Sequence, residues 1–537
     1  MLVDLLRNPE GADTVSDVCI VGAGAAGIPL ARELARHGCS VTLLESGGLD
    51  YEQATQDLYR GANVGMAYYE LENSRLRFFG GTTRIWGGRC ALLDPIDFQA
   101  RDWVPHSGWP IDLTDLEPHY HRAHAFFELD TFDYGPAPLR ERGATLPGFD
   151  PGRITTRLWR FDERHERFGP RMCRDVLDSD RIRVLLHANV VHLQANADAT
   201  AVESLVVRAL GQPERIVRAR HFVLAGGAIE NARLLLASRD VETGGVGNRF
   251  DQVGRYFMEH PNGRLARVHV ADPYAFWMAM QKRFRRLQPP VAPVLALADS
   301  LQRQERTLNS VFTFKLQRRD TAKGATLTQQ LYNNIKHAIN ADAKGRALNH
   351  AYRNVRAWTQ RRVRNTYERL RSRAGLSRLY MMVRGEQAPN PASRIVLSSQ
   401  RDALGVPLAD LNWQLSAIDK HAARVLVHTF DAELRRLGLG CLEPFDWLRD
   451  PGPQWPVDAS IGNHPIAGYH HMGTTRMSDD PRCGVVDANC RVHGYANLFV
   501  AGSSVFPTSG WANPTLTIVA LSYRLAEHLR SVLRVSS

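Results

Sequence analysis

The stretch Asp17-Val-Cys-Ile-Val-Gly22-Ala-Gly24-Ala-Ala-Gly27 contains the pattern that decides the fold. Its apolar start predicts a short buried strand, and the residues after Gly27 have the spacing of a helix. Gly22 permits a tight turn, Gly24 lets a pyrophosphate approach the backbone, and Gly27 lets helix and strand pack closely. The stretch therefore predicts the first β-α unit of a dinucleotide-binding α/β domain.

A second strand is predicted directly after this helix, over residues 40–44, and it ends at Glu45. A carboxylate at this place accepts hydrogen bonds from an adenosine ribose and repels a 2′-phosphate, which disfavours NADP. NAD and FAD both remain open at this point.

Two further glycine-rich loops narrow the choice between these cofactors. One is Arg77-Phe-Phe-Gly80-Gly81-Thr82-Thr83-Arg84-Ile-Trp86-Gly87-Gly88, for which an NAD-binding unit has no evident use. The other has Gly226-Gly227 between an apolar run and a helical pattern, as at the edge of the same sheet. The cofactor domain is therefore expected to be discontinuous, as is typical of large flavoproteins.

The composition is that of an ordinary globular protein. The chain has 537 residues, 44% hydrophobic and 23% charged, with a net charge of +11. These values exclude a disordered, fibrous or disulfide-stapled chain and leave room for two or more domains. Seven cysteines without a CxxC motif, and an N-terminus without signal-peptide features, predict reduced thiols in the cytoplasm and no metal site.

Several segments together resemble the glucose-methanol-choline (GMC) family of FAD oxidoreductases. The tail is most similar to the branch with pyranose oxidase and the large subunits of fructose and gluconate dehydrogenases. The segments that carry the resemblance, besides the first glycine pattern, are Gly80-Gly81-Thr-Thr83, Ala91-Leu-Leu-Asp-Pro-Ile-Asp-Phe98, Gly254-Arg-Tyr-Phe-Met-Glu-His-Pro261, Pro389-Asn-Pro-Ala-Ser-Arg394, His470-His-Met-Gly473-Thr474-Thr-Arg-Met477, Gly484-Val-Val-Asp487, Arg491-Val-His-Gly494, Asn497-Leu-Phe-Val-Ala-Gly502 and Ala512-Asn513-Pro514-Thr515.

The resemblance implies an α/β fold of two domains. A discontinuous Rossmann-like FAD-binding domain is expected from residues 14–100, 185–270 and 465–537. An α+β substrate domain, built on a six-stranded antiparallel sheet, is expected from residues 101–184 and 271–464.

The resemblance also implies the cofactor site. The loop at residues 80–88 has no histidine to which a flavin could be attached, so non-covalent FAD is expected. The residues expected to contact the cofactor, by backbone or side chain, are Gly22, Gly24, Ala26, Gly27, Glu45, Gly80, Gly81, Thr82, Thr83, Trp86, Gly87, Val190, Gly226, Gly502, Ser503, Ala512, Pro514 and Thr515.

The family's H-x-x-G-T pattern selects His470 as the catalytic base, and Asn513 as its polar partner. The reaction it implies removes a hydroxyl proton while the carbon-bound hydrogen leaves as hydride to flavin N5. His471 should point away from His470, because successive side chains of an extended segment alternate. Trp511 departs from the family pattern and is expected to alter the substrate pocket.

The expected function is oxidation of an alcohol to a carbonyl on a sugar, glycoside or polyol. A bulky apolar or lipid-like alcohol is an alternative substrate, and a non-catalytic flavoprotein subunit is an alternative role. The electron acceptor, whether oxygen, quinone or cytochrome, is left open.

The region from 276 to 384 is strongly basic, with 23 Lys and Arg against 5 Asp and Glu. Residues 351–373 have the spacing of a basic amphipathic helix. A solvated helix, an anionic membrane surface or an acidic partner would each explain it, whereas no nucleic-acid recognition motif accompanies the charge. The expected location is the cytoplasm, and the basic region is consistent with a peripheral position at a membrane.

Overall fold

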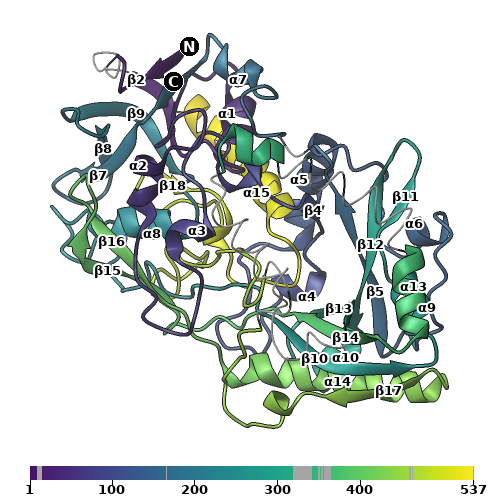
Figure 1. The fold of residues 1–537 in the computed structure, drawn as a ribbon. Coiled ribbons are helices and arrows are strands. Elements are labelled where there is room, and N and C mark those ends of the chain that lie inside the picture. Colours follow the sequence, from purple (N-terminus) through teal and green to yellow (C-terminus); the bar gives the residue numbers. More distant parts are fainter. Residues whose placement is uncertain are drawn as a thin grey trace.

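The strand before Gly22 lies in the middle of an eight-stranded sheet (Figure 1). The computed structural model describes residues 1–8, 15–164, 166–318, 341–348, 351, 355, 365–458, 461 and 464–535. The strands of this first sheet, in spatial order, are β1 (Leu2–Asp4), β6 (Ile182–Leu186), β3 (Val41–Leu44), β2 (Val15–Val21), β9 (Arg215–Leu224), β8 (Val202–Arg208) and β7 (Asn189–Ala195), with β18 (Leu498–Val500) also on β9. Strands β1, β6, β3, β2, β9 and β18 run parallel to one another. Strand β8 pairs antiparallel with β9 on one side and with β7 on the other.

Three helices fix the position of this sheet. Helix α1 (Gly27–Arg36) buries an apolar stripe that includes Ile28, Leu30 and Leu34, as its 3- and 4-residue spacing requires. The C-terminal helix α15 (Thr515–Val535) packs on α1 and on α5 (Leu113–Phe126), while α8 (Ala228–Ala237) follows β9. The predicted β-α-β unit and the discontinuous order are therefore confirmed as parts of one sheet.

A second sheet is antiparallel throughout and has eight strands, where the family resemblance implied six. Two of its strands, β4 and β11, have only two and three residues, too few for a hydropathy pattern to reveal. In spatial order it consists of β17 (Gly440–Pro444), β10 (Asn262–Val270), β14 (Ser377–Arg384), β13 (Val311–Arg318), β12 (Gln288–Leu297), β5 (Ile154–Phe161) and β4 (Arg89–Cys90), with β11 (Arg283–Arg285) on β12.

One face of the second sheet is covered by the long helix α14 (Ala417–Arg436), which runs along the bottom of Figure 1. Phe312 of β13 lies against Phe430 of this helix, with ring centroids 4.8 Å apart. Because side chains alternate along strands, the registers place Trp159 of β5 and Arg384 of β14 on the opposite face. That face is turned toward the first sheet.

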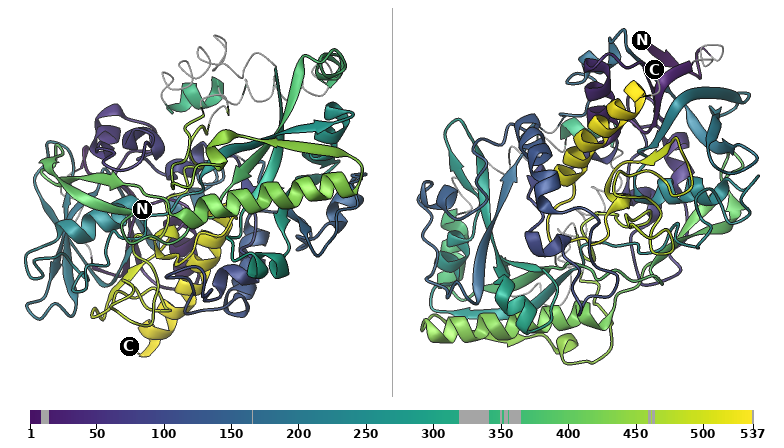
Figure 2. Two further views of the ribbon diagram at one scale, coloured as in Figure 1. Left: turned by 90° about the horizontal axis from the view of Figure 1, so that it is seen from below. Right: turned by 180° about the vertical axis from the view of Figure 1, so that it is seen from behind.

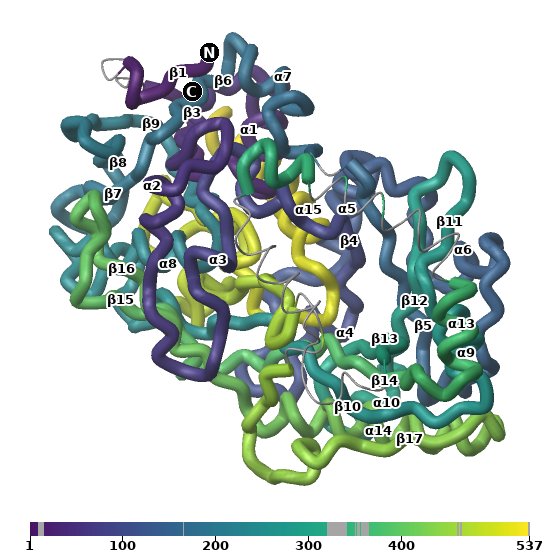
Figure 3. Tube along the Cα trace, in the orientation of Figure 1, coloured from purple at the N-terminus to yellow at the C-terminus, as the bar shows by residue number. Residues whose placement is uncertain are grey.

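The C-terminal part of the chain connects the two halves. The yellow tail before α15 winds through the centre of the molecule, between the two sheets, in both the front and the rear views (Figures 1 and 2). The tube view shows the two ends of the chain on the same side, beside β1 (Figure 3). One apolar cluster contains residues of both sheets and of α15, so the halves share a core.

The remaining elements are short. A two-stranded sheet, β15 (Arg394–Arg401) with β16 (Pro407–Asn412), lies beside α8. Most of the amphipathic helix predicted over 351–373 lies outside the described residues, and its last part forms α13 (Asn365–Arg373). Within the described ranges, no helix combines the length and the apolar character needed to cross a bilayer. The other helices are α2 (Gln53–Gln56), α3 (Leu71–Ser74), α4 (Pro95–Phe98), α6 (Ala137–Arg140), α7 (Arg174–Leu177), α9 (Pro273–Ala279) and α10 (Asp299–Gln304).

Candidate active site

Three loops meet at the carboxyl edge of the parallel strands. Val21, Leu224 and Val500 are paired across β2, β9 and β18, so the glycines that follow them come together. This edge is where doubly wound sheets bind nucleotides. The first glycine pattern, the Gly226-Gly227 pair and Gly502 are thus brought to one place, as the sequence predicts.

The glycines in these loops have two different purposes. A Cβ on Gly22 would lie 2.5 Å from the carbonyl oxygen of Ala225, and one on Gly27 would lie 1.9 Å from that of Gly22. These two glycines are required by the polypeptide itself. A Cβ on Gly24 or Gly227 would meet no protein atom within 4 Å, and one on Gly502 none nearer than 3.8 Å. This second group borders open space, so its backbone is accessible to a ligand.

The loop after Arg77 closes over this space. The amide of Gly80 donates to the carbonyl of Ala23 over 2.8 Å, and a Cβ on Gly81 would lie 4.0 Å from the Cα of Gly24. The hydroxyls of Thr82 and Thr83 serve the loop itself, since they bond the amide of Leu76 and the carbonyl of Gly80. The two predicted glycine loops are therefore neighbours, and their free surfaces fit FAD.

Other predicted contact residues lie around the same edge. The carboxylate of Glu45 accepts hydrogen bonds from the amides of Ala23, at 3.1 Å, and Gly47, at 2.9 Å, and burial raises its pKa. Val190 follows a segment whose Ala188 amide bonds the Glu45 carbonyl. The other predicted positions border these loops or begin the last helix, namely Ala26 at the N-terminus of α1, Trp86 and Gly87 in the closing loop, Ser503 after Gly502, and Ala512, Pro514 and Thr515 at the start of α15.

The predicted pair of catalytic side chains is in contact. The Nδ2 amide of Asn513 donates to Nε2 of His470 over 3.1 Å. Nδ1 of His470 lies 2.8 Å from Nδ1 of His260, and Nε2 of His260 lies 2.9 Å from the carbonyl oxygen of Gly510. His471 points elsewhere, toward the hydroxyl of Tyr68 at 2.9 Å, as alternation predicts.

This chain of contacts determines where the protons are. A carbonyl oxygen can only accept, so Nε2 of His260 carries a hydrogen and its Nδ1 is an acceptor. His470 must then donate from Nδ1, which leaves its Nε2 as a lone-pair nitrogen. Burial, together with the nearby His260 and Arg384, holds the pKa of His470 well below its ordinary value. The group is therefore a neutral imidazole with its basic nitrogen beside Asn513.

Glu259 connects the two segments that carry His260 and His470. Its Oε1 accepts from the amide of His470, over 2.5 Å, and from the hydroxyl of Tyr68, over 2.7 Å. Its Oε2 accepts from the amides of His260 and Gly468. Burial raises the pKa of this carboxyl to about 7, opposed by these hydrogen bonds.

Sequence reasoning missed the roles of Glu259 and His260. Both stand in the segment Gly254–Pro261, whose similarity to the family was recognised without a function for any side chain. Their partner His470 is 210 residues away in the chain, and only the tertiary fold brings them together. The Met-Glu-His-Pro order a few residues after Gly254 is the one local signal in the sequence.

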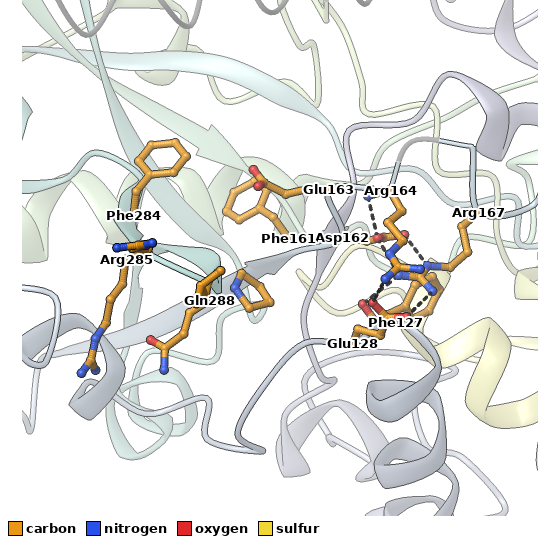
Figure 4. Close-up of a pocket in the computed structure, with 13 residues that line it drawn as sticks. Phe127, Glu128, Phe161, Asp162, Glu163, Arg164, Arg167, Phe284, Arg285 and Gln288 are labelled. Atoms are coloured by element: carbon orange, nitrogen blue, oxygen red, sulfur yellow. Dashed lines mark hydrogen bonds and ion pairs between the residues drawn. The ribbon is translucent and has the colours of Figure 1, made fainter. Parts of the chain in front are cut away.

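A surface pocket of about 510 Å³ lies between the end of β5 and the β11–β12 hairpin (Figure 4). Arg167, which pairs with Asp162 at 2.8 Å, stands at one side of it, and Phe284 and Arg285 stand at the other. None of its lining residues is a predicted site residue. Its lining residue Phe161 has its ring 5.8 Å from the guanidinium of Arg89.

Comparison with known proteins agrees with this geometry. Residues 17–245 match the family described as FAD dependent oxidoreductase, and residues 389–522 match the one described as GMC oxidoreductase. The chain is 27% identical to "6'''-hydroxyparomomycin C oxidase" of Streptomyces lividus, over 97% of this chain and 93% of the relative. It is 22% identical to "Fructose dehydrogenase large subunit" of Gluconobacter japonicus, over 97% and 98%. A "C-glycoside 3-oxidase" of Microbacterium trichothecenolyticum is 36% identical over 26% and 24%.

Solved structures share the fold at low sequence identity. A fungal aryl-alcohol oxidase superposes with a TM-score of 0.56 at 14% identity, over 96% of this chain and 99% of that one. Pyridoxine 4-oxidase from Mesorbium loti gives a TM-score of 0.52 at 17% identity, over 96% and 99%. Together with the shared fold, the matches identify residues 17–245 as an FAD dependent oxidoreductase domain and residues 389–522 as a GMC oxidoreductase domain.

Proposed function

We propose that the protein oxidises an alcohol group of a sugar, glycoside or polyol to a carbonyl, with FAD as the oxidant. The contact between His470 Nε2 and the Asn513 amide, 3.1 Å apart, carries this proposal. Names of relatives that act on sugars and glycosides, such as "Paromamine 6'-oxidase" of Streptomyces fradiae and "Pyranose 2-oxidase" of Tricholoma matsutake, support the substrate class.

His470 and Asn513 have different roles in the proposed reaction. His470 takes the hydroxyl proton on Nε2, and its Nδ1 hydrogen stays bonded to His260. Asn513 donates from Nδ2 to the oxygen as negative charge develops on it. The Oδ1 atom of Asn513 is buried and has no partner among the described residues, so it can accept from a second hydroxyl of a polyol. FAD, when bound, supplies the hydride acceptor.

The cofactor is proposed to be bound without a covalent bond. The loop at residues 80–88 offers no histidine, and its described hydroxyls are engaged within the loop. Denaturation with acid should therefore release all flavin into the supernatant. Flavin that stays with the precipitate would contradict this part of the proposal.

The decisive experiment is an anaerobic visible spectrum of the holoenzyme with a panel of sugars, glycosides, polyols and aliphatic or aromatic alcohols. Bleaching by one class identifies the reductant, and readmitted air separates an oxidase from a dehydrogenase. His470→Ala should slow the bleaching by about 10²–10⁴-fold and keep its flavin. His428→Ala, on the exposed side of α14, is the matched control and should leave the rate unchanged.

A bleaching reaction only with aliphatic or aromatic alcohols would support the alternative of an apolar substrate. No bleaching with any class, in protein that holds FAD, would support the non-catalytic alternative. The presence of both His470 and Asn513 in contact favours catalysis over a purely structural flavin.

The basic region from 276 to 384 is proposed to dock on an anionic membrane surface. Its β11–β12 hairpin exposes Phe284 by 51% and Leu287 by 95%, flanked by Arg283, Arg285 and Arg286. Apolar tips between arginines suit insertion at a charged lipid interface. Binding to vesicles that contain phosphatidylserine, absent with phosphatidylcholine alone and lost in Phe284→Ser/Leu287→Ser, is expected. Binding to an acidic protein, with no binding to either kind of vesicle, would favour the acidic partner.

We also propose a cytoplasmic location and a division into an FAD-binding unit around the first sheet and a substrate unit around the second. All seven cysteines are free thiols, which suits a reducing compartment. In this division β4 and β10 go with the substrate unit, because both pair within the antiparallel sheet.

A further inference from the structure

Trp159 and Arg384 lie on the face of the second sheet that is turned away from α14. The guanidinium of Arg384 lies over the Trp159 ring, 5.4 Å from its centroid. The Trp159 ring is 6.2 Å from that of Trp511, two residues before Asn513 in the chain. The guanidinium of Arg89 lies over the same Trp159 ring at 5.2 Å.

Arg384 is close to the reacting groups. A Cβ on Gly468 would lie 2.7 Å from Nδ1 of His470 and 3.4 Å from an Nη atom of Arg384. Two nitrogens that flank one such point are near neighbours. The Arg384 guanidinium is therefore a neighbour of the His470 imidazole, on the Nδ1 side of the ring, and the proposed base Nε2 belongs to the same ring.

One hydrogen-bond donor of Arg384 and one of Trp159 have no partner within the part of the chain that the structure describes. The buried Nη1 of Arg384 has no hydrogen-bond partner there, and no described carboxylate lies within ion-pair distance of its guanidinium. Trp159 is only 7% exposed, and its Nε1 donor also has no partner. Buried donors are normally paired, and a buried cation normally has an anion beside it.

The charge around these donors is positive. Burial and the nearby Arg89 guanidinium lower the pKa of Arg384 to about 9, so it stays a cation at neutral pH. His260 and His471 are neutral, since burial lowers the pKa of each to about 3. Glu259 is the acid that acts on Arg384, and its oxygens are already used by four donors.

We infer that the substrate carries an anionic group, a carboxylate or a phosphate, next to the alcohol that is oxidised, and that Arg384 binds this group over Trp159. The planar guanidinium can donate two parallel hydrogen bonds to either anion, and Trp159 Nε1 is a third donor. The Arg89 guanidinium, 5.2 Å from the centroid of the same ring, adds positive charge. The inference rests on the proposed oxidation and specifies its substrate as an acidic sugar or hydroxy acid.

Anion binding can be measured without turnover. The holoenzyme is titrated with propionate and, separately, with inorganic phosphate, and the flavin difference spectrum and the melting temperature are recorded. At least one anion should perturb the flavin with a saturable curve, and the responding anion distinguishes a carboxylate from a phosphate substrate. Arg384→Met should weaken this binding at least tenfold, since a charge-assisted hydrogen bond is lost.

Matched substrate pairs then test specificity. Glucose is compared with glucuronate and with glucose 6-phosphate, and sorbitol with gluconate, by the rate of anaerobic bleaching. One acid should give a kcat/KM at least tenfold above its neutral counterpart, and Arg384→Met should remove this preference mainly by raising KM. Arg378→Met is the control, because Arg378 is on the same strand and face but about 20 Å away at 3.3 Å per residue.

The outcomes separate the two proposals. If the neutral sugars bleach the flavin as fast as the acids, and neither anion perturbs the spectrum or the melting temperature, the anionic substrate is wrong while the oxidation stands. If Arg384→Met changes FAD content, or slows neutral and acidic substrates equally, Arg384 acts on the cofactor and the inference fails. If no compound bleaches the flavin but an anion binds through Arg384, the anion site stands and the proposed function fails.

Discussion

In the proposed reaction, His260 decides which nitrogen of His470 acts as the base. The carbonyl of Gly510 fixes the hydrogen of His260 on Nε2, and the acceptor Nδ1 then fixes that of His470. His260→Leu removes this acceptor and should lower the rate of flavin reduction about 10- to 100-fold, the usual cost of losing a group that orients a functional imidazole. His260→Gln, which retains an acceptor and a donor, should recover part of the rate. Stopped-flow bleaching with KM measured separately checks this, and equal rates in Leu and wild type would contradict it.

The sequence singles out the proposed base and its proposed partner because both stand in short local patterns. His470 precedes Gly473 and Thr474, and Asn513 precedes Pro514. The groups that tune them could not be predicted, since His260, Glu259 and Arg384 come from distant segments and reach the site only through the folded sheets. A single histidine or arginine in a strand end gives no signal of its partner.

The turn between β2 and α1 separates what the fold needs from what the cofactor needs. Gly27→Ala would place a methyl 1.9 Å from the Gly22 carbonyl oxygen, so it should destabilise the apoprotein by about 1–3 kcal/mol. Gly24→Ala meets no protein atom within 4 Å and should leave the apoprotein melting temperature unchanged while it weakens FAD binding. Calorimetry of apoprotein and flavin content after purification check the pair. A Gly24→Ala protein with full FAD affinity would place the cofactor elsewhere.

At the level of elements, the strand-turn-helix pattern of the sequence predicts the parallel sheet, whereas no local pattern predicts the antiparallel sheet. Strand β2, helix α1 and strand β3 follow from a strand-turn-helix pattern that is local and specific. The second sheet draws strands from residues 89 to 444, and β4 and β11 exist only because longer neighbours pair with them. Tertiary pairing of this kind overrides local propensity.

At the scale of the whole molecule, the tail makes the cofactor site and the catalytic site one unit. The tail contributes β18 to the first sheet, and Ser503 Oγ bonds the carbonyl of His471 over 2.7 Å. The same tail then supplies Asn513 and helix α15, which packs on α1. A substrate held on the second sheet is therefore positioned against groups that the first sheet fixes.

The cost of keeping the buried histidines 260 and 471 neutral should appear in the stability of the whole protein. Burial lowers the pKa of His260 and of His471 to about 3, whereas the unfolded chain protonates them near 6.5. The unfolded state thus binds more protons as the pH falls below 6.5, so the free energy of unfolding falls with it, by about 1.4 kcal/mol for each imidazole at pH 5.5. The stabilising contribution is complete above pH 6.5 and is lost toward pH 3.

His471→Gln tests this dependence, because the amide can still donate to Tyr68 but cannot titrate. The difference in unfolding free energy between wild type and His471→Gln should shift by about 1.4 kcal/mol in favour of the variant on going from pH 7.5 to pH 5.5. Urea unfolding at both pH values measures it, with His428→Ala, at an exposed position of α14, as the control. A difference that is the same at both pH values would mean that folding does not lower the pKa of His471, and the hydrogen-bond assignment around Glu259 and Tyr68 would have to be revised.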